Sequence, residues 1–486
     1  MPKEFIAAIE LGSSKITGIA GRKNMDGSIT VLQVVKENTN GCIRKGIVYN
    51  IDKTEALLKN IINRLTTSLR CEIKRVYVGA GGQSIRSLRN VINKTFDVET
   101  VVTGEMVDEL MDSNRCMQYP EQEIISQVTQ EYKVDQQFQL DPVGIQCKRL
   151  EGNFLNILWR KTFYLKLNQC FKDTGISIAE MYLAPLVLAE SILNESEKRN
   201  GCVLVDIGAE TTTVSTYYRN LLRHLAVIPL GSSNINKDLT TRQIDDAEAE
   251  ELKLKYASAY TDESSSNDTL EYHIGNDRAI SASDFNNVVE ARMYEIIRNA
   301  WSQVPEEYTD KLLGGIIITG GCSNMDNIIK AFQYHTRKEK VRIARTVTYT
   351  VDSNHPDITA QDGTMNTILA LLAKGDMNCA GKELNSSPDM FEPKENTPED
   401  DIEEKHPEPR DPNKLGPETI QTEEEKKARE AEKKRRETEK QALLDEIKKR
   451  KEEEERQRRE KSFFNRLKRN IKDLTKKIME EEKDTN

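Results

Sequence analysis

The stretch CVLVDIGAETTTVSTY (residues 202–217) decides the fold. An apolar run ends at Asp206, turns at a glycine and resumes as a threonine-rich run of β-forming residues. The same pattern occurs almost 200 residues earlier in FIAAIELGSSKITGIAG (5–21), where the apolar run ends at Glu10. Apolar runs on both sides of a glycine turn predict two β-hairpins, each with an acid where its first strand ends.

Length, charge and cysteine content narrow the class of protein. The 486 residues are too many for one hydrophobic core, so we expect two or more domains. The net charge of −9 argues against a generally basic nucleic-acid surface. The eight cysteines are scattered, without a CxxC pair or a cysteine–histidine cluster, which predicts buried thiols in a reducing cytosol. The N-terminal segment does not match a signal peptide, and no apolar run reaches the roughly 20 residues of a membrane-spanning helix.

Residues 1–375 have a globular composition, in which strand-like runs alternate with helical patterns. This alternation predicts layers of helices and sheets. One helix is expected over 52–69, where apolar residues recur every three or four positions, with Asp52 or Thr54 as its N-cap. The expected strands are 6–9, 16–20, 28–35, 75–79, 203–205, 213–217, 223–228 and 315–319.

The C-terminal part has a different composition. Residues 376–422 hold seven of the fourteen prolines among many acids, which predicts a disordered linker. Residues 423–460 alternate acids and bases at helical spacing and have almost no apolar face, which predicts a solvated charged helix.

The segment 461–480 combines an apolar stripe with basic residues and predicts an amphipathic helix that lies in the interface of an anionic membrane. Each base near such a surface contributes about 1 kcal/mol, so one tail is a weak, reversible anchor, and many tails acting together bind tightly. A helix that packs on a partner protein is the alternative, and nucleic acid is disfavoured. The stripe is Phe463, Phe464, Leu467, Ile471, Leu474 and Ile478, and the bases expected at the lipid include Arg466, Lys468, Arg469 and Lys472.

An acid at the end of a buried strand and the Gly/Ser/Thr turn that follows it can together bind a phosphate group and its metal ion. The backbone N–H groups of the turn can cradle phosphates, and glycine permits close approach. The acid can hold Mg²⁺, usually through water. Two such hairpins would clamp one nucleotide from both sides. A third element, GGIIITGGCSNM (314–325), predicts a buried strand that ends in Gly320 and Gly321, where the backbone can pass close to a flat base.

These three motifs, in this order, resemble the actin-like ATPase superfamily and, within it, the FtsA family of bacterial cell division proteins. The resemblance covers about residues 4–375. It also rests on GCIRKGIVYNID (41–52), VYVGAGGQSIRSL (76–88), QEYKVD (130–135), DPVGIQCKRLEG (141–152), HLAVIPLGSSNINKDL (224–239) and AEELKLKYASA (249–259).

The resemblance implies an α/β, actin-like (ribonuclease-H-like) fold of two domains, with a small FtsA-type insertion, a disordered linker and a C-terminal helix. The implied boundaries are 1–83, 163–200 and 346–375 for the core of domain 1, 84–162 for the insertion, 201–231 and 301–345 for the core of domain 2, and 232–300 for its outer part.

The resemblance also assigns roles to residues. Mg²⁺ would be held by Glu10 and Asp206, and Asp206 would orient the attacking water as the catalytic residue. Glu250 and Lys253, spaced to share one helix face, would meet the ribose or adenine. The adenosine would lie at Gly320, Gly321 and Asn324. The first phosphate loop would be Glu10, Gly12, Ser13, Ser14 and Lys15, and the second Asp206, Gly208, Thr211 and Thr212.

Two departures from the family pattern concern hydrolysis. Glu10 stands where the family usually has aspartate, and the extra methylene shifts the Mg²⁺ shell. Ala209 and Glu210 stand where glycines are usual, and they add a Cβ and a negative charge beside the phosphates. We therefore expect ATP binding with at most slow hydrolysis, in a protein whose work is mainly assembly.

The function implied is that of an ATP-binding cell division protein. It would tether the FtsZ ring to the cytoplasmic face of the inner membrane at the septum, form actin-like filaments and recruit other division proteins. In the family, the outer part of domain 2 binds the C-terminal tail of FtsZ. The alternatives are a phosphotransfer enzyme of the sugar kinase, acetate kinase or exopolyphosphatase type, and a pilus-assembly or shape-determining actin homologue.

Overall fold

A computed structural model describes residues 4–261, 270–275, 278–383 and 416–420, together with five isolated positions, 427, 431, 434, 435 and 438. The chain divides into two units. One comprises Met1–Asn396 with Leu415–Ile420, and the other comprises the rest of the C-terminal part. The predicted membrane helix, 461–480, lies outside the described residues.

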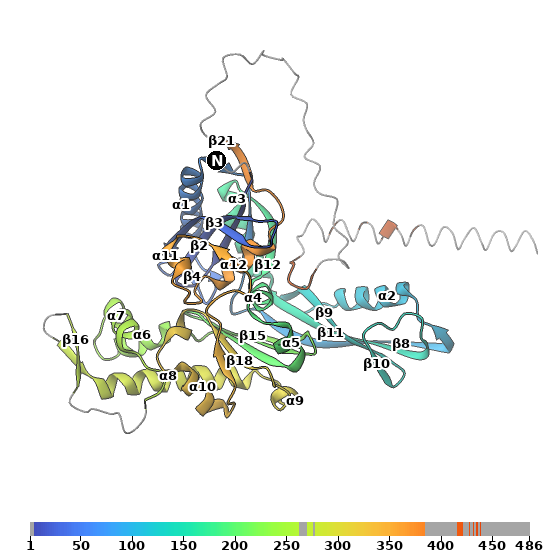
Figure 1. The fold of residues 1–486 in the computed structure, drawn as a ribbon. Coiled ribbons are helices and arrows are strands. Elements are labelled where there is room, and N and C mark those ends of the chain that lie inside the picture. Colours follow the sequence, from blue (N-terminus) through green and yellow to red (C-terminus); the bar gives the residue numbers. More distant parts are fainter. Residues whose placement is uncertain are drawn as a thin grey trace, which may run out of the picture. The chain divides into compact units, whose positions relative to one another are not determined.

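The first half of the larger unit is built on a six-stranded sheet (Figure 1). Its strands, in spatial order, are β12 (Ser177–Leu183), β7 (Arg75–Ala80), β1 (Ile6–Leu11), β2 (Lys15–Lys23), β3 (Ile29–Asn38) and β20 (Val351–Asp352). β1, β2 and β3 are antiparallel neighbours, whereas β7 and β12 run parallel to β1. The helices packed here are α1 (Ile51–Leu69), α3 (Lys161–Thr174), α4 (Ala184–Ile192) and α12 (Asn366–Lys374).

The second half repeats this strand order. Its strands, in spatial order, are β19 (Val341–Ile343), β18 (Gly315–Thr319), β13 (Cys202–Ile207), β14 (Thr212–Tyr218) and β15 (Leu221–Ile228). β13, β14 and β15 are antiparallel neighbours, and β18 and β19 run parallel to β13. β13 therefore corresponds to β1, and the hairpin β13–β14 to the hairpin β1–β2. The actin-like two-domain α/β fold is confirmed.

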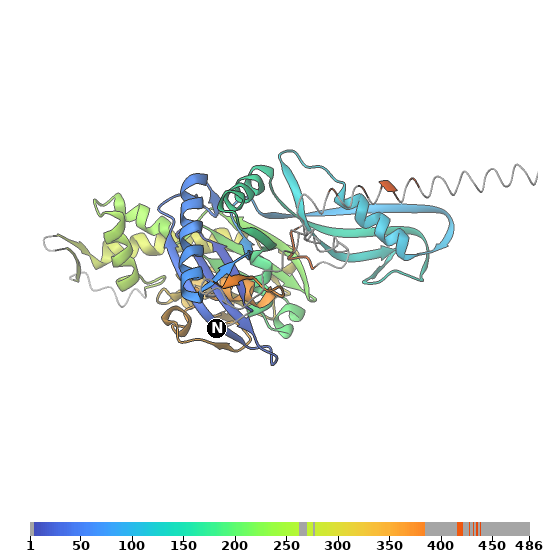
Figure 2. The ribbon, with the colours of Figure 1, turned by 90° about the horizontal axis from the view of Figure 1, so that it is seen from above.

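The insertion adds four strands to the second sheet, which then has nine. In order outward from β15 they are β8 (Arg86–Val101), β11 (Gln146–Arg160), β9 (Gln122–Val134) and β10 (Gln137–Gln139). Figure 2 shows α2 (Gly104–Arg115) lying along these strands, and Leu110 of α2 belongs to a separate buried cluster with Leu150 and Phe154. β8 alternates exposed and half-buried residues over most of its length, whereas β1 and β13 are buried at all positions except their half-buried acids.

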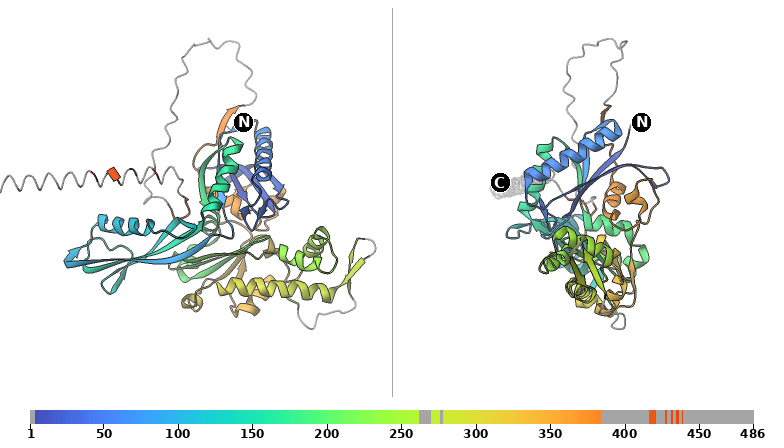
Figure 3. Two further views of the ribbon diagram at one scale, coloured as in Figure 1. Left: turned by 180° about the vertical axis from the view of Figure 1, so that it is seen from behind. Right: turned by 90° about the vertical axis from the view of Figure 1, so that its left-hand side faces the viewer.

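The outer part of the second half is mainly helical (Figure 3). Phe285, Val289 and Met293 of the long helix α8 are fully buried in the core of this half. The elements here are α6 (Ser233–Thr240), α7 (Asp246–Tyr256), β16 (Glu271–Ile274), β17 (Arg278–Ser281) and α8 (Ala282–Ser302).

The remaining elements are short. They are β4 (Ile43–Arg44), β5 (Ile47–Val48), β6 (Cys71–Ile73), α5 (Glu195–Asn200), α9 (Glu306–Thr309), the 3₁₀ helix η2 (Gly321–Asn324), α10 (Ile328–Thr336), α11 (Pro356–Thr359) and β21 (Ala380–Glu383).

Each of the eight expected strands is present, and the helix expected over 52–69 is α1. Its predicted cap was wrong. The helix begins one residue earlier, so the side chain of Asn50 caps it by accepting from the backbone N–H of Lys53 at 2.9 Å. Thr54 is buried and its hydroxyl donates to the carbonyl of Asn50 instead, and Asp52 lies in the first turn.

The folded chain extends past the predicted start of the linker at residue 376. β21 pairs antiparallel with β6, and residues 416–420 belong to the larger unit. In the smaller unit the five described positions are helical, as expected for 423–460, and the hydroxyl of Thr438 donates to the carbonyl of Lys434 at 2.7 Å. Within the described residues no helix has both the length and the apolar character that crossing a membrane requires.

Candidate nucleotide site

The turn of the first hairpin is tightly supported. The backbone N–H of Gly12 donates to the carbonyl of Lys15 at 3.0 Å, and a Cβ on Gly12 would lie 2.7 Å from that oxygen. The hydroxyl of Thr39 donates to the carbonyl of Ser13 at 2.5 Å, and the N–H of Gly46 donates to the Ser13 hydroxyl at 2.8 Å. Ser14 and Lys15 are exposed. The loop is thus held from behind, and its tip is free to meet a ligand.

The turn of the second hairpin closes in the same way, with the N–H of Gly208 donating to the carbonyl of Thr211 at 2.8 Å. Its support differs, because the loop before α6 contacts it through backbone. The N–H groups of Ser232 and Ser233 donate to the carbonyls of Gly208 and Ala209 at 3.0 and 2.7 Å. These bonds hold the second loop against the start of α6.

Thr212 lies beneath the second loop rather than at its tip. Its side chain is fully buried, and its hydroxyl donates to the carbonyl of Leu230 at 2.8 Å. Only Gly208 and Thr211 of the predicted phosphate-binding set therefore lie partly exposed at the turn.

Strand β18 brings its terminal glycine against the second acid. Asp206 pairs with Thr319, and Gly320 follows with a φ of +87°. A Cβ on Gly320 would lie 2.4 Å from Oδ1 of Asp206, so only glycine fits here. A Cβ on Gly321 would meet only a methyl group of Thr364, at 3.8 Å, and Asn324 donates through Nδ2 to the carbonyl of Asp362 at 2.8 Å. Gly320 therefore lies directly beside the first strand of the second hairpin.

The charge of Asp206 in the second half affects the pKa of Glu10 in the first half. Burial raises the pKa of Glu10 to about 8, and the negative charge of Asp206 adds to the rise, while Lys36 and a hydrogen bond with Thr367 oppose it. Burial alone raises the pKa of Asp206 to about 6. Two carboxyl groups held in a poorly solvated place resist ionisation together. A cation between them would relieve this cost.

That donor set fits a magnesium ion. Mg²⁺ is usually bound through one or two carboxylates and keeps its other positions for water and substrate phosphates. Glu10 and Asp206 supply two carboxylates, and the turn amides beside them suit the phosphates. Across the described part of the chain, no group of three or more histidines, cysteines or acids is placed to hold a metal by itself.

Helix α7 places Glu250 and Lys253 on one face, as their spacing predicts. Nζ of Lys253 lies 2.5 Å from Oε2 of Glu250, and Nδ2 of Asn236 donates to the same oxygen at 2.7 Å. Burial opposes ionisation of Glu250, but these two hydrogen bonds outweigh it and lower its pKa, with a further contribution from Lys15. The charge of Lys15, in the first hairpin turn, therefore acts on Glu250 of α7.

Glu210 makes contacts with the β4–β5 hairpin and α6 that the sequence did not predict. Its carboxylate accepts a hydrogen bond from the backbone N–H of Lys45 at 2.6 Å, and Lys237 lies 4.0 Å away. Lys45 and Gly46 form the tip of the β4–β5 hairpin, and both have positive φ. Gly46 also donates to Ser13, so this hairpin joins both phosphate loops. The charge of Glu210 is thus used in a link between the two halves.

The predicted site residues fall into two groups that contacts or electrostatic effects connect. Glu10, Asp206 and Gly320 form one group, and Lys15, Glu250 and Lys253 form the other. Sequence reasoning missed Thr39, Gly46 and Asn236, which support the site from behind. The GSSN run (231–234), a second Gly-Ser turn after an apolar strand, was the available signal for the loop that supports the second hairpin.

Comparison with known proteins identifies the family of the chain. The model of the family "Cell division protein FtsA" matches residues 203–363, and that of the "SHS2 domain inserted in FTSA" matches 82–158. A cell division protein FtsA from Porphyromonas gingivalis is 31% identical over 335 residues, which cover 67% of this chain and 70% of the relative. The chain belongs to the FtsA family. The corresponding protein of Pseudomonas aeruginosa is 27% identical over 67% of this chain and 80% of its own length.

Family membership confirms the resemblance drawn from the motifs and favours a cell division protein over the phosphotransfer and pilus-assembly alternatives. Among solved structures, the chain is similar to one described as the PilM-PilN type IV pilus biogenesis complex. The TM-score is 0.52 and the identity 14%, covering 76% of this chain and 98% of that one. At this identity the likeness concerns the fold alone. The match at 82–158 agrees with the insertion expected at 84–162.

Proposed function

We propose that this FtsA-family protein binds ATP with Mg²⁺ between its two hairpins. The observation that carries the proposal is the pair of acids, Glu10 and Asp206, at the ends of corresponding strands, each followed by a turn whose backbone amides suit phosphates. A bound Mg²⁺ would supply charge that offsets both carboxylates and the phosphates.

The position of each remaining site residue indicates which part of the nucleotide it would contact. The exposed turn residues Ser14 and Lys15, with Ser13 and Gly12, suit one side of the phosphates, and Gly208 and Thr211 suit the other. Thr212 acts from beneath, by holding the second loop to Leu230. Glu250 and Lys253 suit the ribose or adenine, and Gly320, Gly321 and Asn324 suit the adenosine. Asp206 is the one candidate for orienting water, so hydrolysis is slow at most.

We further propose that the protein tethers the FtsZ ring to the cytoplasmic face of the inner membrane at the septum. Family membership supports a role in division, and the apolar and basic stripe of 461–480 supports a lipid contact. FtsZ would bind through the outer part of the second half, 232–300. Self-association into filaments would place many tails on one membrane, and the assembly would recruit other division proteins.

Titration calorimetry of ATP into the full chain tests the nucleotide site. We expect micromolar binding that requires Mg²⁺ and weakens at least about tenfold in Asp206→Asn, because one magnesium ligand is lost. Asp310→Asn is the matched control, since that side chain is fully exposed on a distant loop. Binding that ignores both Mg²⁺ and Asp206→Asn would overturn the proposal.

Vesicle flotation tests the tether. The full chain should float with vesicles that contain phosphatidylglycerol. It should not float when the vesicles are made of neutral phosphatidylcholine alone. Ile471→Asp places a charge in the apolar stripe and should abolish flotation. Asn465→Asp adds the same charge on the opposite side of the expected helix and should retain most of it. Equal loss in both variants would point to net charge alone and contradict the amphipathic-helix proposal.

A further inference from the structure

Residues 416–420 are packed on the larger unit although 32 residues of sequence separate them from β21. β12, the strand they meet, is the edge strand of the first sheet. The N–H of Leu183 donates to the carbonyl of Glu418 at 2.8 Å, and the N–H of Ile420 donates to the carbonyl of Met181 at 3.0 Å. Thr419 stands opposite Tyr182 in an antiparallel bridge. This is the hydrogen-bond pattern of strand addition to a sheet edge.

The side chains of the segment are also matched to their surroundings. Ile420 is only 2% exposed and belongs to the main hydrophobic core. Nζ of Lys374 lies 3.0 Å from Oε1 of Glu418 and 2.5 Å from Oε2 of Glu190. A carboxylate two residues before an aliphatic side chain thus fits a site that offers the half-buried ammonium group of Lys374 and an apolar core.

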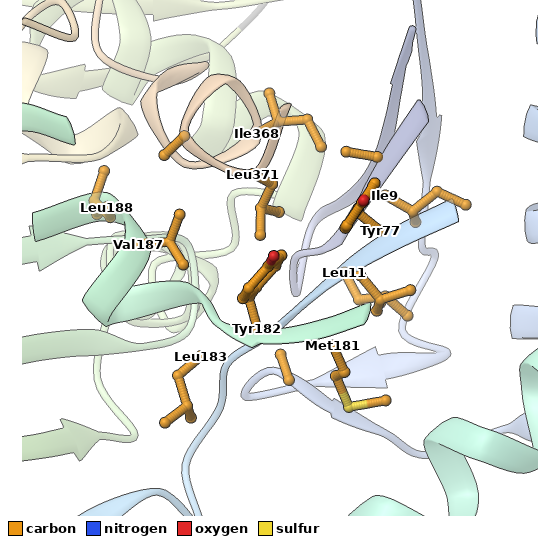
Figure 4. Packing of buried hydrophobic residues seen from close by; sticks show 14 of the residues in the cluster. Ile9, Leu11, Tyr77, Met181, Tyr182, Leu183, Val187, Leu188, Ile368 and Leu371 are labelled. Carbon is orange, nitrogen blue, oxygen red and sulfur yellow. The ribbon is translucent and has the colours of Figure 1, made fainter. Parts of the chain in front are cut away.

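The segment touches the insertion as well as the sheet. The hydroxyl of Ser126, on β9, hydrogen-bonds to the carbonyl of Pro417. Beneath the contact, the ring of Tyr182 stacks on that of Tyr77 with centroids 6.0 Å apart, and Figure 4 shows Tyr182 facing Leu371 of α12. The docking place is therefore a rigid corner between the first sheet and the insertion.

We propose that residues 416–420 form a docking strand through which the chain attaches its own C-terminal tail to the edge of β12. When the segment is docked, residues 421–460 connect the body to the tail, whereas release of the segment lengthens this connection to residues 384–460. Docking thereby sets where the tail leaves the body and roughly halves the number of residues that connect the two, which shortens the reach of the tail. This inference is independent of the nucleotide site.

Several features make the docking reversible. The described segment is five residues long, and two backbone hydrogen bonds hold it to β12. The second oxygen of Glu418 is buried without a hydrogen-bond partner among the described residues, which weakens the fit of the acid. A short strand held this way opens more readily than the core of a sheet.

Hydrogen exchange of the full chain tests the proposal through the amide of Leu183, because its N–H donates to the backbone carbonyl of Glu418. Ile420→Asp would bury an unpaired charge in the apolar core, so the segment should detach and Leu183 should exchange about tenfold faster or more. Ile402→Asp makes the same change elsewhere in the predicted linker and should leave Leu183 protected. Because Ile420 lies at the end of an added strand, the exchange of β1 and β13 should stay slow in both variants and report that the body is folded.

Two outcomes would overturn the docking strand. One is an unchanged exchange rate of Leu183 in Ile420→Asp with an intact body. The other is protection in the unaltered chain that disappears on about a hundredfold dilution, because the segment would then come from a second copy. Protection that persists on dilution and is lost only in Ile420→Asp supports attachment within one chain.

Discussion

The hairpins β1–β2 and β13–β14 share a topology and differ in what holds their turns. In both, the strand-end acid pairs with a threonine across the hairpin, Glu10 with Thr17 and Asp206 with Thr213. The first turn is held by two hydroxyl groups and by a backbone bond from Thr39 to Ser14, and the second mainly by the backbone of the loop before α6. The repeated fold therefore specifies where each acid lies, whereas local contacts specify how firmly each turn is held.

The largest expected effect comes from filling the space beside the second acid. Gly320→Ala places a Cβ 2.4 Å from Asp206 and 2.6 Å from the carbonyl of Ile207, in a backbone conformation that alanine adopts poorly. We expect a loss of roughly 2–4 kcal/mol in the free energy of unfolding. Urea denaturation measures it.

Gly321→Ala is the control for this prediction. Its nearest neighbour is a methyl group of Thr364 at 3.8 Å, which is ordinary contact. The free energy of unfolding should change by less than about 0.5 kcal/mol. Equal losses in the two variants would show that the close approach of Gly320 to Asp206 is not what holds this corner.

The acid pair should make stability depend on pH in the absence of nucleotide and Mg²⁺. The folded-state pKa of Glu10, about 8, and that of Asp206, about 6, lie above those of unfolded carboxyl groups. The folded chain binds more protons between these values, so its stability should fall as pH rises from about 5 to 8. We expect a fall of roughly 1–3 kcal/mol, because both groups remain partly solvated.

Glu10→Gln removes the larger of these two titrations. Urea unfolding at several pH values in EDTA should show a much shallower fall in this variant than in the unaltered chain. A parallel fall in both would assign the pH dependence to other groups, and a rise with pH would contradict the sign of the argument.

Substitutions at two buried threonines test the contacts that support the two hairpin turns. Thr39→Val removes the hydroxyl that holds Ser13, and Thr212→Val removes the one that holds Leu230. Each should cost about 1–1.5 kcal/mol of unfolding free energy, because a buried carbonyl loses its donor. In Thr212→Val the affinity for ATP should change less than about threefold, since this hydroxyl already has a partner. A tenfold weaker affinity at unchanged stability would place the hydroxyl on the phosphates.

Glu210 provides the smallest expected effect. Glu210→Ala removes the acceptor for the N–H of Lys45 and should lower the free energy of unfolding by about 1 kcal/mol. Glu210→Gln keeps an oxygen acceptor and should lose about half as much. Thermal unfolding of the two variants side by side measures the difference, and identical values would argue against the link between the halves.

The sequence predicted the strands and the acids well for a physical reason. Strands covered on both faces appear as continuous apolar runs, and an acid that interrupts such a run at a glycine turn is easy to see. Family resemblance then placed Gly320, Glu250 and Lys253, which the structure brings near Asp206 or the first loop.

Contacts between distant backbone groups were not predictable in this way. Glu210 binds the N–H of Lys45, 165 positions away, and any residue could supply that donor. The pairing of β21 (AGKE) with β6 has no apolar signal, so the linker was expected to begin at 376. Thr212 looked like a phosphate ligand because its hydroxyl partner, the carbonyl of Leu230, leaves no trace in the sequence.

The central claim is that both hairpins hold one nucleotide. Hydrogen exchange of the full chain with and without ATP and Mg²⁺ tests it most directly. The account predicts that the amides of 12–15 and of 208–211 slow together, and that Asp206→Asn abolishes the protection at both turns. Protection confined to one turn, or retained at the first turn in Asp206→Asn, would contradict it.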